Sequence, residues 1–166
     1  YQRAALTPLD CLVDIYSQMG IQYPKFFKMD ILCKTAFLLS ELLIQNQAAV
    51  FESETHNPNR TALVLATTSG CIAVDNQFLK SIDNIPSPAL FVYTLPNIML
   101  GEICIRNHFK GEQLCLIQAA QDSVALNQYA DNLITHYHTT TVIVGYIEAT
   151  ELRITGELWL KNTTTL

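Results

Sequence analysis

The sequence has few basic residues and no long apolar run. Lys and Arg number 10 against 15 Asp and Glu, which gives a formal net charge of -5 at pH 7. Nucleic acids and anionic membranes require clustered positive charge, so neither is expected as a partner. The apolar run from Leu38 to Ile44 is interrupted by Ser40 and Glu41, and no stretch reaches the roughly 20 residues of a membrane-spanning helix. We therefore expect no membrane association.

The cysteine patterns of a disulfide framework or a zinc site are also missing. The five cysteines are odd in number, form no C-x-x-C pair and lie in apolar surroundings: Cys11, Cys33, Cys71, Cys104 and Cys115. This distribution favours reduced core thiols in a cytoplasmic protein. No G-x-G-x-x-G motif or P-loop is present, so we expect no nucleotide, no other cofactor and no metal.

What the sequence does contain is a large apolar fraction. Hydrophobic residues make up 49% of the 166 residues and charged residues only 15%. This length suits one domain with a sizeable core, and we expect a single domain over residues 1–166. Such a composition also indicates a surface that is partly covered by a partner.

Helical and strand-like segments alternate along the chain. Helices are predicted over Thr7 to Gly20, Phe26 to Gln47, Ile72 to Ile82, Ile98 to His108 and Ala119 to Ile134. Strands or extended segments are predicted over Thr61 to Thr67, Phe91 to Thr94, Leu114 to Ile117, Thr141 to Ile147 and, as an edge strand, Leu152 to Leu160. Strands separated by helices predict a layered α/β sheet with right-handed crossovers.

Three consecutive motifs carry a resemblance to a known family. The segment from Pro88 to Asn97 is followed by Gly101-Glu102-Ile103 and then by Lys110-Gly111-Glu112. This order resembles the β-ketoacyl synthase family, in which a segment ending in Asn precedes a short helix, a glycine turn and the strand that leads to the nucleophile.

Further segments match the same family. Phe27-Lys28-Met29-Asp30 is similar to its Lys-Met motif before an early helix, and Ala62 to Gly70 is similar to its Leu-Gly-Thr strand. Val142 to Gly145, with Glu148-Ala149, resembles its strand that ends in Gly near a Glu-Ala pair. The order holds from about residue 26 to about residue 150.

The resemblance implies a thiolase-like layered α/β fold. We expect a mixed sheet with helices on both faces, equivalent to the N-terminal half of a ketosynthase. The family's first strand, with its glycine turn, is not found before Tyr1, so we expect that strand to be absent or replaced.

The position of the family's nucleophile carries no reactive side chain. A synthase places a cysteine at the start of the helix after the nucleophile strand, where the positive helix end lowers the thiol pKa. That position falls at Ala120, within Gln118-Ala119-Ala120-Gln121, and no Cys follows Leu116. Neither Ala nor Gln can carry an acyl thioester. The catalytic histidines belong to the family's C-terminal half, which lies beyond this chain's length.

A glutamine near the vacant cysteine position resembles the chain length factors, silent synthase-like subunits that pair with an active ketosynthase. Short members of this kind resemble subunits of aryl polyene and flexirubin pigment systems. The resemblance implies a non-catalytic cytoplasmic subunit of fatty acid, polyketide or polyene biosynthesis. Its partner would be a catalytic ketosynthase or a second copy of the chain, with an acyl carrier protein as a further candidate.

Two local features carry the expectations about binding. An apolar strand over Leu114, Cys115, Leu116 and Ile117 would expose unpaired backbone groups at a sheet edge, so we expect these residues at the subunit interface. Asn97 is a candidate for the vestigial pocket, with a loop-capping amide as the equal alternative.

Two other functions stay open on the sequence. One is a divergent condensing enzyme or acyltransferase that uses Cys115 or Cys104 with an unfamiliar base. The other is a binding or scaffold domain with an unrelated partner.

Overall fold

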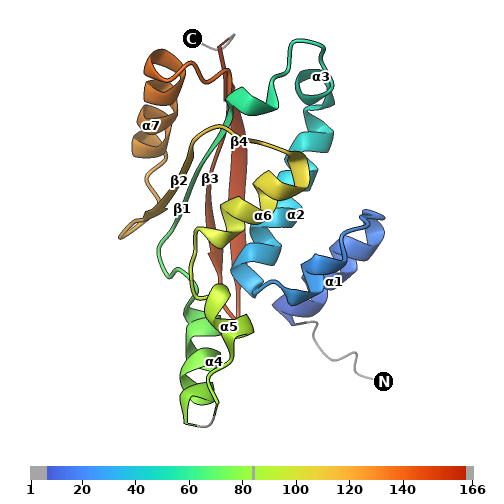
Figure 1. Cartoon of the computed structure of the whole chain (residues 1–166), viewed down its shortest axis with the longest axis vertical. Helices are drawn as coiled ribbons and strands as arrows, with labels where there is room; N and C mark the ends of the chain where they lie inside the picture. Colours follow the sequence, from blue (N-terminus) through green and yellow to red (C-terminus); the bar gives the residue numbers. More distant parts are fainter. Residues whose placement is uncertain (1–6, 84, 164–166) are drawn as a thin grey trace.

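A mixed four-stranded sheet forms the centre of the molecule (Figure 1). The computed structural model describes residues 7–83 and 85–163. In the order β2-β1-β3-β4, β1 pairs in parallel with β2 and β3, and β3 pairs antiparallel with β4. The strands are β1 (Thr61–Thr67), β2 (Gln113–Ile117), β3 (Thr141–Ala149) and β4 (Ile154–Asn162). The mixed sheet predicted from the sequence is confirmed, and β4 lies at an edge as expected.

Helices cover both faces of this sheet. They are α1 (Pro8–Gln18), η1 (Pro24–Lys28), α2 (Ile31–Asn46), α3 (Ala48–Phe51), η2 (Pro58–Arg60), α4 (Ile72–Ile82), α5 (Pro88–Val92), α6 (Ile98–Asn107) and α7 (Ser123–His136). One face packs against α2 and α6 and the other against α7 (Figure 1). Figure 1 shows α4 and α5 together at one end of the molecule, beyond the end of β1.

The burial of strand β1 explains why its sequence is a nearly continuous apolar run and does not alternate between apolar and polar residues. All seven of its residues are buried, because successive side chains point to opposite, equally covered faces. Leu63 and Leu65 join the cluster under α2 and α6. Ala62, Val64 and Ala66 join the cluster under α7.

The close approach of β3 and β4 requires a glycine. Gly145 pairs with Leu158 across the two strands. A Cβ atom at Gly145 would lie 2.1 Å from Leu158 Cδ2 and 2.5 Å from the Glu157 carbonyl oxygen. The glycine of the family-like strand therefore has a packing reason in this fold.

Helix starts follow their capping residues. Thr7 and Asp10 form a capping box at the start of α1, as the sequence indicates. The long helix begins at Ile31, not at the predicted Phe26, because the Asp30 carboxylate accepts hydrogen bonds from the Leu32 and Cys33 N–H groups, each at 3.0 Å. The residues before Asp30 form the short 3₁₀ helix η1.

The extended segment predicted over Phe91 to Thr94 is wrong. These residues lie in α5 and the turn after it. Ser87 Oγ accepts a hydrogen bond from the Leu90 N–H at 3.3 Å, and Pro88 occupies the first helical position. The cap and the proline therefore outweigh the β propensity of the aromatic and branched residues.

The sequence analysis expected no membrane-spanning helix and no first strand of the family, and the described residues bear on these two expectations to different extents. Within residues 7–83 and 85–163, no helix is long and apolar enough to cross a membrane. Residues 1–6, before which the family's first strand was sought, lie outside the described residues.

Candidate functional site

Strand β2 forms one edge of the sheet, with β1 as its only neighbour among the described strands. Leu114, Cys115 and Leu116 are half-buried, and 61% of Ile117 is exposed. Leu114 and Leu116 pack toward α7, while Cys115 packs toward the cluster under α2 and α6. The strand therefore presents apolar side chains beside a free backbone edge.

The backbone groups at this edge alternate in direction. The Leu63 N–H donates to the Glu112 carbonyl at 2.9 Å, and the Gln118 N–H donates to the Thr67 carbonyl at 3.0 Å. Even-numbered residues of this segment thus turn their backbone groups toward β1. Gln113, Cys115 and Ile117 consequently turn their N–H and C=O groups away from the sheet.

The turn after β2 holds Gln118, Ala119, Ala120 and Gln121, the four residues that the resemblance aligns with the family's nucleophile region. The predicted helix start at Ala119 is wrong, because α7 begins at Ser123 after the Asp122 carboxylate accepts from the Ala125 N–H at 2.9 Å. Ala119 and Ala120 are exposed in the loop before the helix. This loop therefore offers no side chain that could form a covalent intermediate at Ala120.

The two glutamines of this turn differ in their contacts. The Gln121 side-chain amide donates to the Glu157 carboxylate of β4. The Gln118 Oε1 atom is buried and has no hydrogen-bond partner among the described residues. Buried acceptors are usually satisfied, so the Gln118 carbonyl oxygen is an exception in this turn.

The Glu148 carboxylate, which the sequence analysis mentions only as part of a family-like motif, connects the ends of β1 and β3. Glu148 accepts hydrogen bonds from Thr67 Oγ1 at 2.8 Å and from the Ser69 N–H at 3.1 Å, and also from the Thr68 N–H. The Tyr146 hydroxyl donates to the same carboxylate at 3.2 Å. Burial raises the pKa of Glu148, but these hydrogen bonds outweigh it and hold the pKa below the ordinary value.

The cysteines do not resemble catalytic nucleophiles. Burial raises the pKa of both Cys104 and Cys115 to about 11. It raises the pKa of Cys33 well above the usual range, and that of Cys71 also rises. A neutral buried thiol is a poor nucleophile, so the alternative of an enzyme based on Cys104 or Cys115 finds no support in the geometry.

Asn97 lies at the start of α6 with an exposed side chain. Its amide makes no capping hydrogen bond, and it does not line the cavity of about 850 Å³ between α1, the start of α2 and the α4–α5 pair. Within residues 7–83 and 85–163, no group of three His, Cys, Asp or Glu side chains could hold a metal ion.

Known structures share this architecture. No protein-family model matches the sequence, and no curated protein matches it. The structure of the ishigamide ketosynthase/chain length factor matches with a TM-score of 0.72 and 19% identity, over 92% of this chain and 48% of that chain.

Two further complexes match in the same way. The ketosynthase ApeO with its chain length factor ApeC, from Xenorhabdus doucetiae, gives a TM-score of 0.64 and 14% identity, over 86% of this chain and 62% of that chain. AntDE:AntF, a type II polyketide synthase acyl-carrier protein in complex with its ketosynthase, gives a TM-score of 0.63 and 12% identity, over 86% of this chain and 48% of that chain.

These likenesses establish the class of fold. The chain has the thiolase-like α/β fold of ketosynthases and chain length factors, as the sequence resemblance predicted. It spans between 48% and 62% of the length of these three structures.

Proposed function

We propose that this chain is a non-catalytic, chain-length-factor-like subunit that pairs with an active β-ketoacyl synthase. The observation that carries the proposal is the apolar edge of β2, which is unpaired among the described strands and leads directly into the turn with Ala120, the residue that the resemblance aligns with the nucleophile. The fold, shared with ketosynthase and chain length factor complexes, supports it.

The pairing would extend the sheet across two chains. The outward N–H and C=O groups of Gln113, Cys115 and Ile117 can bond to an edge strand of the ketosynthase. The exposed Ile117 side chain would be covered at the same time. An apolar contact of this kind also accounts for the large hydrophobic share of the sequence.

The turn from Gln118 to Gln121 would then face the partner's reaction site without taking part in the chemistry. The Gln118 side chain, whose buried Oε1 atom has no partner among the described residues, would turn outward to accept a hydrogen bond from the partner or its substrate. Shaping of the partner's acyl tunnel is the role that follows from such a position.

The wider setting belongs to the same proposal. We place the complex in the cytoplasm, where the five free cysteines stay reduced, and in fatty acid, polyketide or aryl polyene biosynthesis. One of the similar structures contains an acyl-carrier protein with its ketosynthase, so an acyl carrier protein is the candidate third component.

Co-expression with a candidate active β-ketoacyl synthase tests the proposal. Size-exclusion chromatography with light scattering should show a stable complex of the two chains, and chain extension by the ketosynthase should depend on this subunit. No complex, together with acyl-thioester turnover by this chain alone, would mean that the chain is itself an enzyme.

Variants at the β2 edge sharpen the test. Ile117→Lys places a charge where the partner strand would pack and should weaken the complex at least about tenfold. Ile117→Pro removes an outward N–H group while sparing the bonds to β1. Leu152→Lys, at a site that is 93% exposed in the β3–β4 turn, should leave the complex intact. Equal weakening by Leu152→Lys would point to a non-specific effect and count against this interface.

A further inference from the structure

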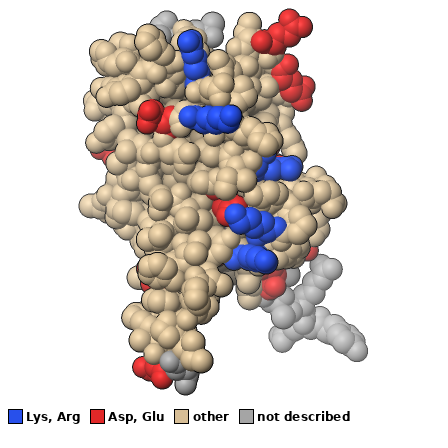
Figure 2. Space-filling view, viewed as in Figure 1, with Lys and Arg blue, Asp and Glu red and all other residues tan. Residues whose placement is uncertain are grey.

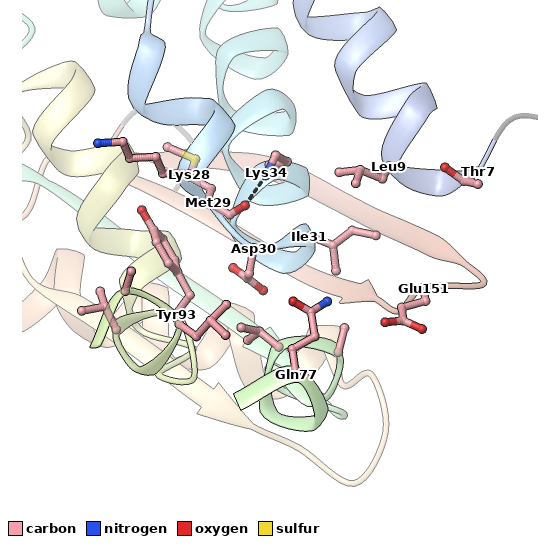
Figure 3. A pocket seen from close by; sticks show the side chains of 15 residues that line it. Thr7, Leu9, Lys28, Met29, Asp30, Ile31, Lys34, Gln77, Tyr93 and Glu151 are labelled. Carbon is pink, nitrogen blue, oxygen red and sulfur yellow. Dashed lines mark hydrogen bonds between the residues drawn. The ribbon is translucent and has the colours of Figure 1, made fainter. Parts of the chain in front are cut away.

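A cavity of the described residues lies between α1, the start of α2, and the α4–α5 pair (Figure 3). It measures about 850 Å³, within the size range of small-molecule sites. Its walls are mainly apolar and include Leu9, Ile31, Val74, Leu90 and Val92. On the face shown in Figure 2, the end of the molecule formed by α4 and α5 is mostly uncharged, apart from an acidic group at its tip.

A buried ammonium group lines this cavity. Lys34, in α2, is only 6% exposed, and its Nζ atom donates to the Met29 carbonyl (Figure 3). It also lies 5.6 Å from the centre of the Phe26 ring. An ammonium group has three donors, and Nζ has no second hydrogen-bond acceptor among the described residues. Burial lowers the pKa of Lys34, and the nearby Asp30 carboxylate offsets part of this effect.

A second donor lies on the opposite wall. Tyr93, just after α5, is 9% exposed and its hydroxyl forms no hydrogen bond with the described residues. Figure 3 shows the hydroxyl directed toward the side of the cavity that carries Lys28 and Met29. Burial raises the pKa of Tyr93 to about 12, so the phenol keeps its proton and acts as a donor.

The two carboxylates near the cavity do not satisfy these donors. Asp30 accepts from the N–H groups of Leu32 and Cys33 and thereby caps α2. Glu151 is exposed, and neither acid forms an ion pair with Lys34. The cavity therefore combines two unsatisfied donors with apolar walls.

We propose that this cavity binds an aliphatic monocarboxylate, with the carboxylate between the Lys34 ammonium and the Tyr93 hydroxyl and the chain along the apolar walls. One negative charge neutralises the buried ammonium. Asp30 and Glu151 repel any anionic head, and they repel a doubly charged one such as a phosphate more strongly than a single carboxylate. The site does not depend on pairing with a ketosynthase, because none of its lining residues belongs to β2.

Displacement of dansyl-labelled undecanoate by unlabelled dodecanoate tests the site on the full chain. We expect saturable binding of the labelled acid at one site and its complete displacement by dodecanoate. Dodecan-1-ol, which has the same chain without the charge, should compete at least about tenfold more weakly. Equal competition by the alcohol would overturn carboxylate recognition, and the absence of saturable binding would overturn the site.

Matched variants identify the donors. Lys34→Met and Tyr93→Phe should weaken dodecanoate binding about tenfold and about fivefold. Lys110→Met removes an exposed ammonium outside the cavity and should leave binding unchanged. Thermal unfolding checks that each variant folds, which we expect because replacement of a buried charge by an apolar chain of similar size is tolerated.

Ala89→Trp provides a test that leaves both donors in place. Ala89 is an exposed wall residue, so an indole there should fill the mouth of the cavity and abolish binding. Unchanged binding in Lys34→Met and Ala89→Trp would show that the acid binds elsewhere and would overturn the proposal.

Discussion

At the residue scale, burial decides the chemistry of the thiols. Cys115 lies in an apolar strand and Cys104 in the buried face of α6. With a pKa of about 11 in both cases, only about one thiol in 10⁴ is ionised at pH 7. These cysteines therefore contribute packing rather than reactivity.

This difference is measurable by alkylation. Iodoacetamide at pH 7 should modify Cys104 and Cys115 far more slowly in the folded chain than in the chain unfolded by urea, as followed by mass spectrometry of peptides. Raising the pH toward 9 should accelerate both, because the thiolate fraction rises as the pH approaches the pKa. Rapid modification of Cys115 in the folded chain, at the rate of the unfolded one, would restore the enzyme hypothesis.

Residues differ in how far the sequence alone could predict them. The vacant nucleophile position at Ala120 stays a prediction, which rests on the absence of any Cys after Leu116. The roles of Glu148 and Tyr93 were not predictable from the sequence, because they depend on tertiary placement: the hydrogen bond between Glu148 and Thr67 joins residues 81 positions apart. Hydrophobic periodicity and motif spacing describe one helix or strand at a time, so they do not predict contacts between distant parts of the chain.

At the element scale, capping chemistry explains both the accurate and the wrong boundaries. Thr7, followed by proline, correctly marked the start of α1. Ser87 with Pro88 started α5 within a segment whose residue types favour a strand. For short segments, one cap can outweigh the summed propensity of four or five residues, so these are the elements that composition predicts least well.

The connection between β1 and α4 depends on one side chain from β3. Glu148→Gln removes the charge that accepts from the Thr68 and Ser69 N–H groups, and we expect a loss of about 1–2 kcal/mol in the free energy of unfolding at pH 7. Urea unfolding measures this loss. Glu151→Gln, at an exposed carboxylate, is the matched control and should change stability little.

The sign of the pH dependence follows from the lowered pKa of Glu148. Between its folded and unfolded pKa values the unfolded chain binds more protons, so the stabilisation is complete above the ordinary value of 4.5 and is lost as the pH falls through the folded pKa. The difference between the parent chain and Glu148→Gln should therefore narrow below pH 4.5. A constant difference down to acid pH would show that the carboxylate charge is not the cause.

At the scale of the whole molecule, the two edges of the sheet differ in how well they are protected. Strand β4 carries Glu157 and Lys161, and charged side chains hinder the addition of another strand. Strand β2, with the sequence Gln-Leu-Cys-Leu-Ile, carries no charge. The unprotected edge is thus the one that continues into the Gln118–Gln121 turn, which is where a silent subunit would need its partner.

Without a partner chain, the unprotected edge of β2 should bind the same edge of a second copy. We expect the isolated chain to associate with itself at high concentration through β2, as measured by light scattering over a concentration series, and Ile117→Lys to keep it monomeric. Addition of the ketosynthase should convert the self-associated chain into the mixed complex, because one strand edge can accept only one neighbour. If the isolated chain stayed monomeric at high concentration and Ile117→Lys still bound the ketosynthase normally, the β2 edge would not be the pairing surface, and the partner would have to be sought on another face of the same fold.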